Sequence, residues 1–315
     1  MFSPFPGHKK QKRTVFLALP GIFTVFLLVL AACGTPVASN NPPATPTGGA
    51  SKPSVAAPKN LITPGVLTVG SDTTYPPQEY IDPQTQKPAG FDIDLINAIA
   101  AKMGLRANVQ TANFDTIIES LAAKRYDVVI SAVTINEERK AKADFIPYFN
   151  AGESLLVRKG NPKNIKSVTD LCGLNAGVQN GTVEQPELEN ASKDCKKAGK
   201  PEIKITALKN QTDVIQLLAT NRVDATYQDS PVTDYYLKQH SDQFEVGGSV
   251  VNVAQEGIVV RKGDTEMFNA IQSAFNQVKA DGTYRSLIEK WGLTSGAIAI
   301  IDERPRATAR VAPTI

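Results

Sequence analysis

Arg139 is the residue of this sequence whose type and setting best suit the binding of an anion. It lies three residues after Asn136, a good helix cap, and two glutamates suited to a first helical turn stand between them. A guanidinium there can hold a carboxylate through two parallel hydrogen bonds, with backbone amides near Thr134 completing the contact. The alternative is a solvated helix arginine that pairs with Glu138 or Asp144. The pattern alone leaves both roles open.

Thr182 and Asp229 offer a second contact for an anion and a partner for a cation. Thr182-Val-Glu-Gln185 fits a capping box, so a helix is expected to start at Thr182, with free amides that favour an anion. Asp229 follows a predicted buried strand and could receive an ammonium group. Both residues also have ordinary roles, Thr182 as a plain helix start and Asp229 as the cap of a helix that begins near Ser230-Pro231.

The sequence gives little support for a catalytic site, a nucleotide-binding site or a metal site. One histidine follows the N-terminal leader, His240, and its polar surroundings favour a surface position over an acid–base role. No phosphate-binding glycine motif follows a predicted strand. His240 and the cysteines are too isolated from one another for metal-ligand spacing. We therefore expect no cofactor and no metal.

The first 32 residues predict a lipoprotein signal peptide, with Cys33 as the lipidated residue. A basic start precedes an apolar run from Val15 to about Leu30, and Leu30-Ala-Ala-Cys33 ends it. The alternative is a transmembrane helix, but the run is short against the roughly 20 apolar residues that a span needs, and Pro20-Gly21 interrupts it. Lipidation at Cys33 would hold the protein at the outer face of the cytoplasmic membrane.

The charge of the chain gives no reason to expect a nucleic-acid partner. The formal net charge of +3 includes four cations of the leader, so the chain from Cys33 onward carries −1. Residues 33–60 are rich in Pro, Ala, Ser and Thr and predict a disordered, lipid-anchored linker. Enough chain remains after it for one large domain or two moderate ones.

Strand-like and helix-like runs alternate from residue 66 onward, which predicts an α/β fold. The expected strands cover residues 66–71, 105–111, 126–131, 174–178, 203–206 and 223–227. The expected helices cover residues 92–103, 115–124, 212–220, 264–280 and 282–291, with another from 183. Ligands of open α/β sheets bind beyond the carboxyl ends of the strands, so polar residues at 131–134 and 228–230 are expected to face one cleft between two lobes.

Two similar stretches, residues 153–159 and 256–262, predict paired hinge strands, because each ends in Val-Arg-Lys-Gly. Lobe 1 is then expected to comprise residues 61–151 and 252–293, lobe 2 residues 152–251, and residues 294–315 a loose tail. Cys172 and Cys195 both fall in lobe 2. A cell-surface location favours a disulfide between them, worth about 3 kcal/mol, whereas two separate buried thiols are the alternative.

An ordered set of motifs over about residues 61–293 resembles the family 3 solute-binding proteins of polar amino-acid ABC transporters. The motifs are Gly70-Ser-Asp72-Thr-Thr-Tyr75-Pro-Pro, Gly90-Phe-Asp-Ile-Asp-Leu95, Ser131-Ala-Val-Thr134-Ile-Asn-Glu-Glu-Arg139, Gln179-Asn-Gly181-Thr182, Gln228-Asp229-Ser-Pro and Asp281-Gly-Thr-Tyr284 to Trp291. The resemblance implies a type II periplasmic-binding fold, whose two lobes close on a free amino acid. It also implies an ABC permease and ATPase complex as partner, and we expect a monomer.

The resemblance implies a role for each site residue. The α-carboxylate would be held by Arg139, with backbone at Thr134 and Thr182. The α-ammonium would be held by Asp229 and by the region of Ser131 and Ala132. The side-chain pocket would be lined by Asp72, Tyr75, Phe114, Gln179 and Gln228. Two departures from the family pattern leave the pocket's shape open, Val183 in place of glycine and Gln78 in place of an aromatic residue.

A carboxylate at Asp72 beside the rings of Tyr75 and Phe114 suits a cationic or amide side chain, which favours Arg, Lys, His or Gln over Glu or Asp. Core packing is the ordinary alternative for both rings. Two other functions stay open. A cyclohexadienyl-dehydratase-like enzyme on the same fold would need Glu79 or Glu184 to face the ligand as a general acid. An amino-acid sensor module would need a signalling domain, and nothing after Leu293 suggests one.

Overall fold

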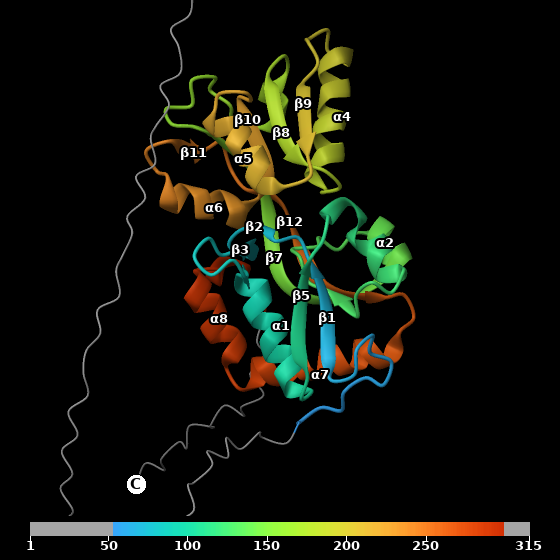
Figure 1. The fold of residues 1–315 in the computed structure, drawn as a ribbon. Coiled ribbons are helices and arrows are strands. Elements are labelled where there is room, and N and C mark those ends of the chain that lie inside the picture. The colour runs from blue at the N-terminus through green and yellow to red at the C-terminus, as the bar shows by residue number, and fades with distance from the viewer. Residues whose placement is uncertain (1–52, 299–315) are drawn as a thin grey trace, which may run out of the picture. The chain divides into compact units, whose positions relative to one another are not determined.

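The computed structural model describes residues 53–298, which all belong to one compact unit of the chain (Figure 1). Strands and helices alternate along it, as the sequence pattern predicts. The predicted signal peptide, the lipidation site Cys33 and most of the predicted linker lie outside the described residues. Among the helices that are described, none is both long enough and apolar enough to span a membrane.

The described elements are as follows. The strands are β1 (Val66–Ser71), β2 (Thr74–Tyr75), β3 (Glu79–Ile81), β4 (Pro88–Ala89), β5 (Arg106–Thr111), β6 (Val128–Val129), β7 (Ala143–Arg158), β8 (Asn175–Gln179), β9 (Lys204–Leu208), β10 (Ala225–Asp229), β11 (Phe244–Val246) and β12 (Val251–Arg261). The α-helices are α1 (Phe91–Lys102), α2 (Ile117–Ala122), α3 (Glu137–Lys142), α4 (Glu184–Lys197), α5 (Gln211–Ala219), α6 (Ser230–Gln239), α7 (Thr265–Ala280) and α8 (Thr283–Trp291). Short 3-10 turns cover Phe114–Thr116, Val168–Leu171 and Thr294–Gly296.

One mixed sheet runs through both lobes in the order β5-β1-β6-β12-β7-β10-β8-β9, with β11 also paired to β7. β1 is parallel to β5 and β6, and β8 is parallel to β9 and β10. Between these two parallel groups β7 and β12 run antiparallel to each other and cross from one lobe to the other (Figure 1). The first half of β7 belongs to lobe 1, and its second half pairs with β10 from Glu153 onward.

Each lobe has its own hydrophobic core. In lobe 1, α1, α7 and α8 pack on one face of the sheet around Phe91 and Phe275, and α2 covers the other face with Ile117. In lobe 2, α4 packs against β8 with Leu188, while Leu218 of α5 lies in a separate cluster. Separate cores allow each lobe to move as a body. The architecture is the predicted α/β, two-lobe, type II periplasmic-binding fold; the residue boundaries of the lobes stay a prediction.

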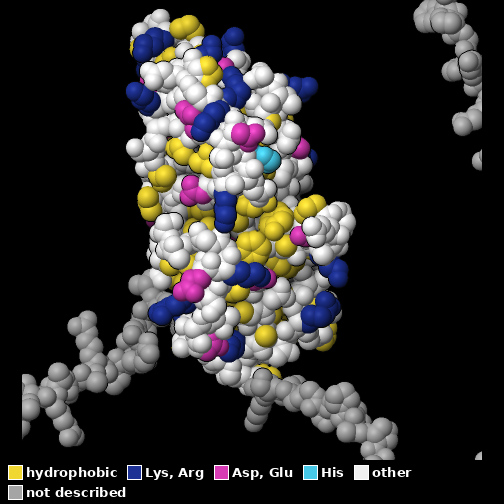
Figure 2. Space-filling model, turned by 90° about the vertical axis from the view of Figure 1, so that its left-hand side faces the viewer, with side chains coloured by type: hydrophobic (Ala, Val, Ile, Leu, Met, Phe, Trp, Pro, Cys, Tyr) yellow, Lys and Arg dark blue, Asp and Glu magenta, His cyan; other side chains and the backbone are white. Residues whose placement is uncertain are grey.

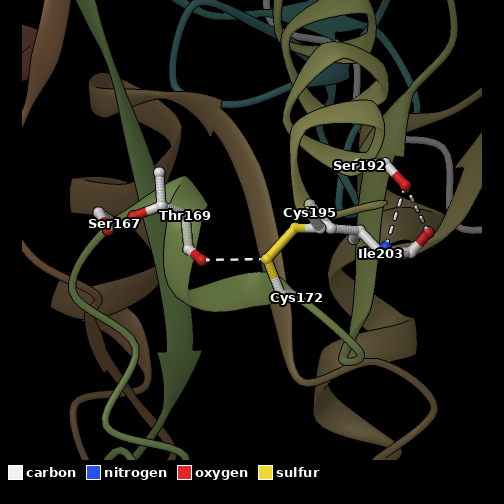
Figure 3. Close-up of a disulfide and its surroundings, with 6 residues drawn as sticks. All are labelled: Ser167, Thr169, Cys172, Ser192, Cys195 and Ile203. Carbon is white, nitrogen blue, oxygen red and sulfur yellow. Dashed lines mark hydrogen bonds between the residues drawn. A yellow bond between two sulfur atoms is a disulfide. The ribbon is translucent and has the colours of Figure 1, made fainter. Parts of the chain in front are cut away.

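The predicted disulfide is present in lobe 2. Cys172 and Cys195 are bonded, with their Cα atoms 5.6 Å apart, and the bond ties α4 to the segment before β8 (Figure 3). Beside it, the Ser192 hydroxyl accepts a hydrogen bond from the Ile203 backbone N–H at 3.0 Å. The alternative of two separate buried thiols is therefore wrong.

Two terminal segments are packed, although the sequence predicts them to be loose. Within the predicted linker, Pro58 is buried and the Ser54 N–H donates to the Lys102 carbonyl at 3.0 Å. Within the predicted tail, residues 294–296 form a 3-10 turn and Ala297 forms an antiparallel bridge with Phe149. These contacts depend on distant partners and have no periodicity of their own, so a local pattern cannot reveal them.

Candidate ligand-binding site

Side chains from both lobes surround a cavity at the cleft. They are Asp72, Tyr75, Phe114, Ala132, Thr134 and Arg139 from lobe 1, and Thr182, Val183, Glu184 and Asp229 from lobe 2. The cavity volume is about 10 Å³, close to the least that one water molecule needs. The lobes are therefore closed on each other, and a ligand of amino-acid size can enter only when they separate.

Eight of the eleven predicted ligand-binding residues line this cavity, and three lie one layer behind it. The Ser131 hydroxyl donates to Glu79 at 3.0 Å and accepts from the Asp72 N–H at 2.8 Å. Gln179 donates to the Asp72 carboxylate. Gln228 donates to the Thr233 hydroxyl at 2.6 Å. These three residues support the wall of the cavity rather than form it.

The Arg139 guanidinium spans the two lobes. Nη1 donates to the Thr134 carbonyl at 2.7 Å and Nη2 to the Gly181 carbonyl of lobe 2 at 3.0 Å, and the Phe114 ring lies 5.4 Å from Cζ. Burial lowers the pKa of Arg139 from its ordinary value, while Glu184 and Asp229 act in the opposite direction. The predicted cap is present, since Asn136 accepts from the Arg139 N–H at 2.8 Å.

The alternative role for Arg139, pairing with a neighbouring acid, is wrong. Glu138 contacts Lys142 at 3.1 Å and Asp144 contacts Lys262 at 2.9 Å. In the part of the chain that is described, no carboxylate forms an ion pair with Arg139. The guanidinium is therefore directed into the cleft, with only carbonyl oxygens as hydrogen-bond acceptors.

Asp229 lines the cavity from lobe 2, at the end of β10. Its carboxylate accepts the Tyr75 hydroxyl at 2.9 Å, and its N–H donates to the same hydroxyl at 3.1 Å. This hydrogen bond crosses between the lobes, and the side chain does not cap α6. Burial is the main cause that raises the pKa of Asp229 to about 7. Tyr75 is thus a cleft residue, not only a packing residue.

Asp72 also lines the cavity and is 2% exposed. It accepts the Thr74 hydroxyl at 2.8 Å and the Gln179 amide from lobe 2. Burial raises its pKa to about 6, and the bonds from Thr74 and Gln179 only partly offset that shift. A cationic group brought close to Asp72 would favour its ionised form.

Glu184 lines the cavity, although it is not among the ligand-binding residues predicted from the sequence. Its side chain is 1% exposed, and Oε1 has no hydrogen-bond partner among the described residues. Burial, with Asp229 as the next cause, raises its pKa to about 8. A buried carboxyl with a free oxygen facing a cavity is suited to a ligand donor, because an unpaired polar atom is costly. No periodic signal in the sequence could have identified it.

The predicted capping box at Thr182 is wrong. α4 begins at Glu184 with Val183 as its cap, and no side chain bonds to the helix start. The Thr182 hydroxyl instead donates to the Gln179 carbonyl at 3.0 Å, and Gln185 accepts from the Gly181 N–H at 2.9 Å. Val183 and Glu184, at the start of this helix, both line the cavity.

Gly181 allows the two lobes to approach each other at this point. Its φ is +78°, and a Cβ atom there would lie 2.7 Å from the Asp115 Cα of lobe 1. Any larger residue would meet backbone rather than a flexible side chain. The Gly181 carbonyl that accepts from Arg139 therefore depends on glycine at this position.

Aromatic rings from β3, α6 and α8 lie close together on the face that carries α6 and α8. Tyr80 of β3 lies 6.2 Å from Tyr235 of α6 and 6.2 Å from Trp291 of α8, measured between ring centroids. Figure 2 shows hydrophobic side chains gathered near the middle of this face. The contact between Tyr80 and Tyr235 joins the two lobes outside the cavity.

The other titratable groups do not build a second reaction centre in the described part of the chain. His240 ends α6 and packs edge-on against Phe244, with ring centroids 6.2 Å apart. No cluster of His, Cys, Asp or Glu with metal-binding geometry occurs among the described residues. Glu79 and Glu184 are both buried, and Glu184 lines the cavity, so burial alone does not distinguish a binding protein from a dehydratase-like enzyme.

Comparison with known proteins distinguishes a binding protein from a dehydratase-like enzyme. The profile of the bacterial extracellular solute-binding proteins, family 3, matches residues 67–294. The L-cystine-binding protein TcyJ of Escherichia coli K12 is 32% identical over 228 residues, which is 72% of this chain and 82% of TcyJ. An ancestral arginine-binding protein bound to arginine superposes with a TM-score of 0.67 at 39% identity, over 72% of this chain and 98% of that chain.

A further solved structure bears on the enzyme alternative. The ancestral amino acid-binding protein AncCDT-1, a precursor of cyclohexadienyl dehydratase, superposes with a TM-score of 0.62 at 36% identity, over 72% of this chain and 95% of that chain. AncCDT-1 is itself an amino acid-binding protein, as are TcyJ and the ancestral arginine-binding protein. The relatives thus place the chain with binding proteins rather than enzymes. It belongs to the family 3 bacterial extracellular solute-binding proteins, the amino-acid-binding components of ABC transporters.

Proposed function

We propose that this protein binds a basic L-amino acid, with arginine as the first choice, and delivers it to an ABC permease and ATPase complex. The observation that carries the proposal is the charge of the cavity. Three buried carboxyl groups line it, those of Asp72, Glu184 and Asp229, against one guanidinium, that of Arg139. A buried charge is costly unless it is paired, so the cavity favours a ligand that brings more positive than negative charge.

The placement of these groups suits an amino acid lying along the cavity. Its α-carboxylate would replace the carbonyl contacts of Arg139, assisted by backbone at Thr134 and Thr182. Its α-ammonium would bind Asp229, with Glu184 nearby. A cationic side chain would then pair with Asp72, with the Tyr75 and Phe114 rings also in the lining. The Ser131–Ala132 segment, Gln179 and Gln228 would hold this wall in place.

Other ligands fit the same cavity less well. Cystine carries two carboxylates, and Arg139 is the only cation among the residues that line the described cavity. Glutamine is neutral at its side chain and would leave the Asp72 carboxyl without a charge partner. The similarity to an ancestral arginine-binding protein agrees with this ranking of ligands, but the ranking depends on the charge of the cavity.

Titration calorimetry with a panel of arginine, lysine, histidine, glutamine, glutamate and cystine tests the proposal. Basic amino acids are expected to bind tightest and glutamate weakest. Tightest binding of glutamine, glutamate or cystine would contradict it. Recovery of unchanged arginine after prolonged incubation with the protein is the accompanying check for turnover.

We also infer that the protein is anchored to the outer face of the cytoplasmic membrane through a lipid on Cys33. The support is the leader sequence that ends at Leu30-Ala-Ala-Cys33. A Cys33→Ser variant is expected to leave the membrane fraction and to incorporate no labelled fatty acid. If the variant and the unaltered protein both stay in the membrane fraction and neither incorporates the fatty acid, the leader acts as a transmembrane helix instead.

A further inference from the structure

Ala132 lines the ligand cavity in a backbone conformation that alanine rarely adopts. Its φ is +46°, in the left-handed region that favours glycine. Seven described residues other than glycine have a positive φ, and Ala132 is the only buried one among them. Four of the other six are asparagines, whose side chains can hydrogen-bond locally and so ease this conformation. Alanine has no such group, so contacts with other segments must hold Ala132 in place.

The contacts that hold Ala132 come from the interior of lobe 1. Its N–H donates to the Asp92 carboxyl and to the Tyr148 hydroxyl, in each case at 3.2 Å. The same Tyr148 hydroxyl donates to the same Asp92 oxygen at 2.6 Å. Asp92 is the second residue of α1 and Tyr148 lies in β7, and both side chains are buried. Two elements far apart in the sequence therefore meet at one backbone N–H.

The carbonyl of Ala132 has no such partner. Among the described residues, none donates a hydrogen bond to the Ala132 carbonyl oxygen. The neighbouring backbone is fixed, because the Ile130 N–H donates to the Gly70 carbonyl at 3.2 Å and the Val133 carbonyl accepts from the Gly257 N–H at 3.0 Å. A buried carbonyl without a donor is costly. An ammonium group in the cavity can supply the missing hydrogen bond.

Asp92 belongs to the motif Gly90-Phe-Asp-Ile-Asp-Leu95, which supports the family resemblance but contains no predicted ligand-binding residue. The other acid of the motif, Asp94, forms an ion pair with Lys290 at 2.6 Å and accepts the Trp291 indole N–H at 2.9 Å. Asp94 thus ties α1 to α8. Asp92 instead contacts a residue of the cavity lining.

We propose that Asp92 and Tyr148 are positioning residues for the amino end of the ligand. They hold Ala132 in its left-handed conformation and so keep the free Ala132 carbonyl available to the α-ammonium, together with Asp229. Neither Asp92 nor Tyr148 lines the cavity, so both act through Ala132. The inference rests on the proposed function only in that the ligand is an amino acid, because the α-ammonium is common to all of them.

Calorimetry with two ligands tests the proposal, since arginine and 5-guanidinopentanoate differ only in the α-ammonium. Asp92→Ala is expected to weaken arginine binding about tenfold and 5-guanidinopentanoate binding by a much smaller factor. Tyr148→Phe keeps the ring in the core and should change the ratio of the two affinities in the same direction. Tyr284→Phe is the matched control, because its hydroxyl lies in the same core and donates to the Tyr148 carbonyl at 2.7 Å. It should leave the ratio unchanged.

A second substitution distinguishes positioning from a general loss of stability. Glycine adopts a positive φ without strain, so Ala132→Gly in the Asp92→Ala background is expected to recover most of the lost arginine affinity. Ala132→Gly alone is the reference for that recovery. If Asp92→Ala does not fold, the same comparison is made with Tyr148→Phe, with and without Ala132→Gly.

Two outcomes would overturn the proposal. One is an equal fold-loss for both ligands in the Asp92 and Tyr148 variants. The other is no recovery of arginine affinity on Ala132→Gly. If the unaltered protein binds another amino acid more tightly than arginine, the choice of arginine is wrong. The variants are then tested with that amino acid and its analogue without the α-amino group, and the same two outcomes decide the proposal.

Discussion

Two of the groups of buried carboxyls in the described structure differ in one respect, since only one of the two lines the cleft. Asp72, Glu184 and Asp229 line the cleft. Glu79, Asp92 and Glu256 lie inside lobe 1, where Asp92 accepts the Tyr148 hydroxyl at 2.6 Å and Ser131 donates to Glu79. Burial raises the pKa of all six, in the case of Asp92 to about 7.

The difference between the two groups shows that burial of a carboxyl does not by itself define a ligand-binding site. The cleft carboxyls come from both lobes, and a cation that enters between the lobes can pair with them. The inner carboxyls come from lobe 1 and β12 and have only neutral donors as hydrogen-bond partners in the described structure, so they are stable mainly when protonated.

The strongest test removes the cation of the cleft. Arg139→Ala is expected to weaken arginine binding by about 2–5 kcal/mol, because truncating one partner of a buried charge pair leaves the other unpaired. Titration calorimetry measures the loss. Lys140→Ala is the matched control, since Lys140 lies next in the same helix and is exposed. Near-unchanged affinity in the Arg139 variant would show that the α-carboxylate binds elsewhere.

A second test concerns Asp72 in the cleft. Asp72→Asn is expected to cost about 1–3 kcal/mol with arginine and much less with citrulline, its neutral isostere, because only arginine loses a charged partner. Asp213→Asn on the exposed side of α5 is the control. Equal losses with both ligands would remove Asp72 as the residue that selects charge.

The pH dependence sharpens the comparison further. A carboxyl whose pKa is raised by folding keeps its proton to higher pH than in the unfolded chain, so ligand-free stability should fall as pH rises from about 5 to about 8. Arginine needs the ionised forms of Asp72, Asp229 and Glu184, whose pKa values are about 6, 7 and 8, so its affinity should rise over the same range. Thermal unfolding and calorimetry follow the two trends, and parallel trends would contradict the account.

The smallest effect is expected from the inner group. Glu79→Gln keeps the size of the side chain and should leave the preference for arginine over citrulline unchanged. The variant should also lose less folding stability than the unaltered protein as the pH rises to 8, because it lacks one carboxyl whose pKa is raised by burial. Denaturant unfolding at two pH values measures that change. A lost ligand preference in this variant would show that the inner and cleft groups act as one.

Much of the fold follows from local patterns in the sequence. The strand at Val66–Ser71 occurs as predicted, α7 begins one residue after its predicted start, and Asn136 caps its helix, because alternation, amphipathic spacing and capping are local properties. The placement of the site residues depended on the ordered family motifs, since no local pattern brings Tyr75 to Asp229 across two lobes.

What the sequence could not predict depends on contacts between distant segments. Glu184 lines the cavity at the first residue of α4, and only the packing of α4 against the cleft decides that position. Gln228 looks like a cleft residue from its place after Tyr227, yet it bonds to Thr233 within lobe 2. Each outcome is decided by how two segments pack, not by the residue types alone.

The most direct test of the central claim is the ratio of the arginine and citrulline affinities of the unaltered protein, measured by calorimetry near pH 7.5. The two ligands have nearly the same shape, so the ratio isolates the charge of the side chain. We predict that arginine binds at least about tenfold tighter than citrulline, the equivalent of 1.4 kcal/mol. Equal affinities, or tighter binding of citrulline, would contradict the claim that the cleft carboxyls select a cationic ligand.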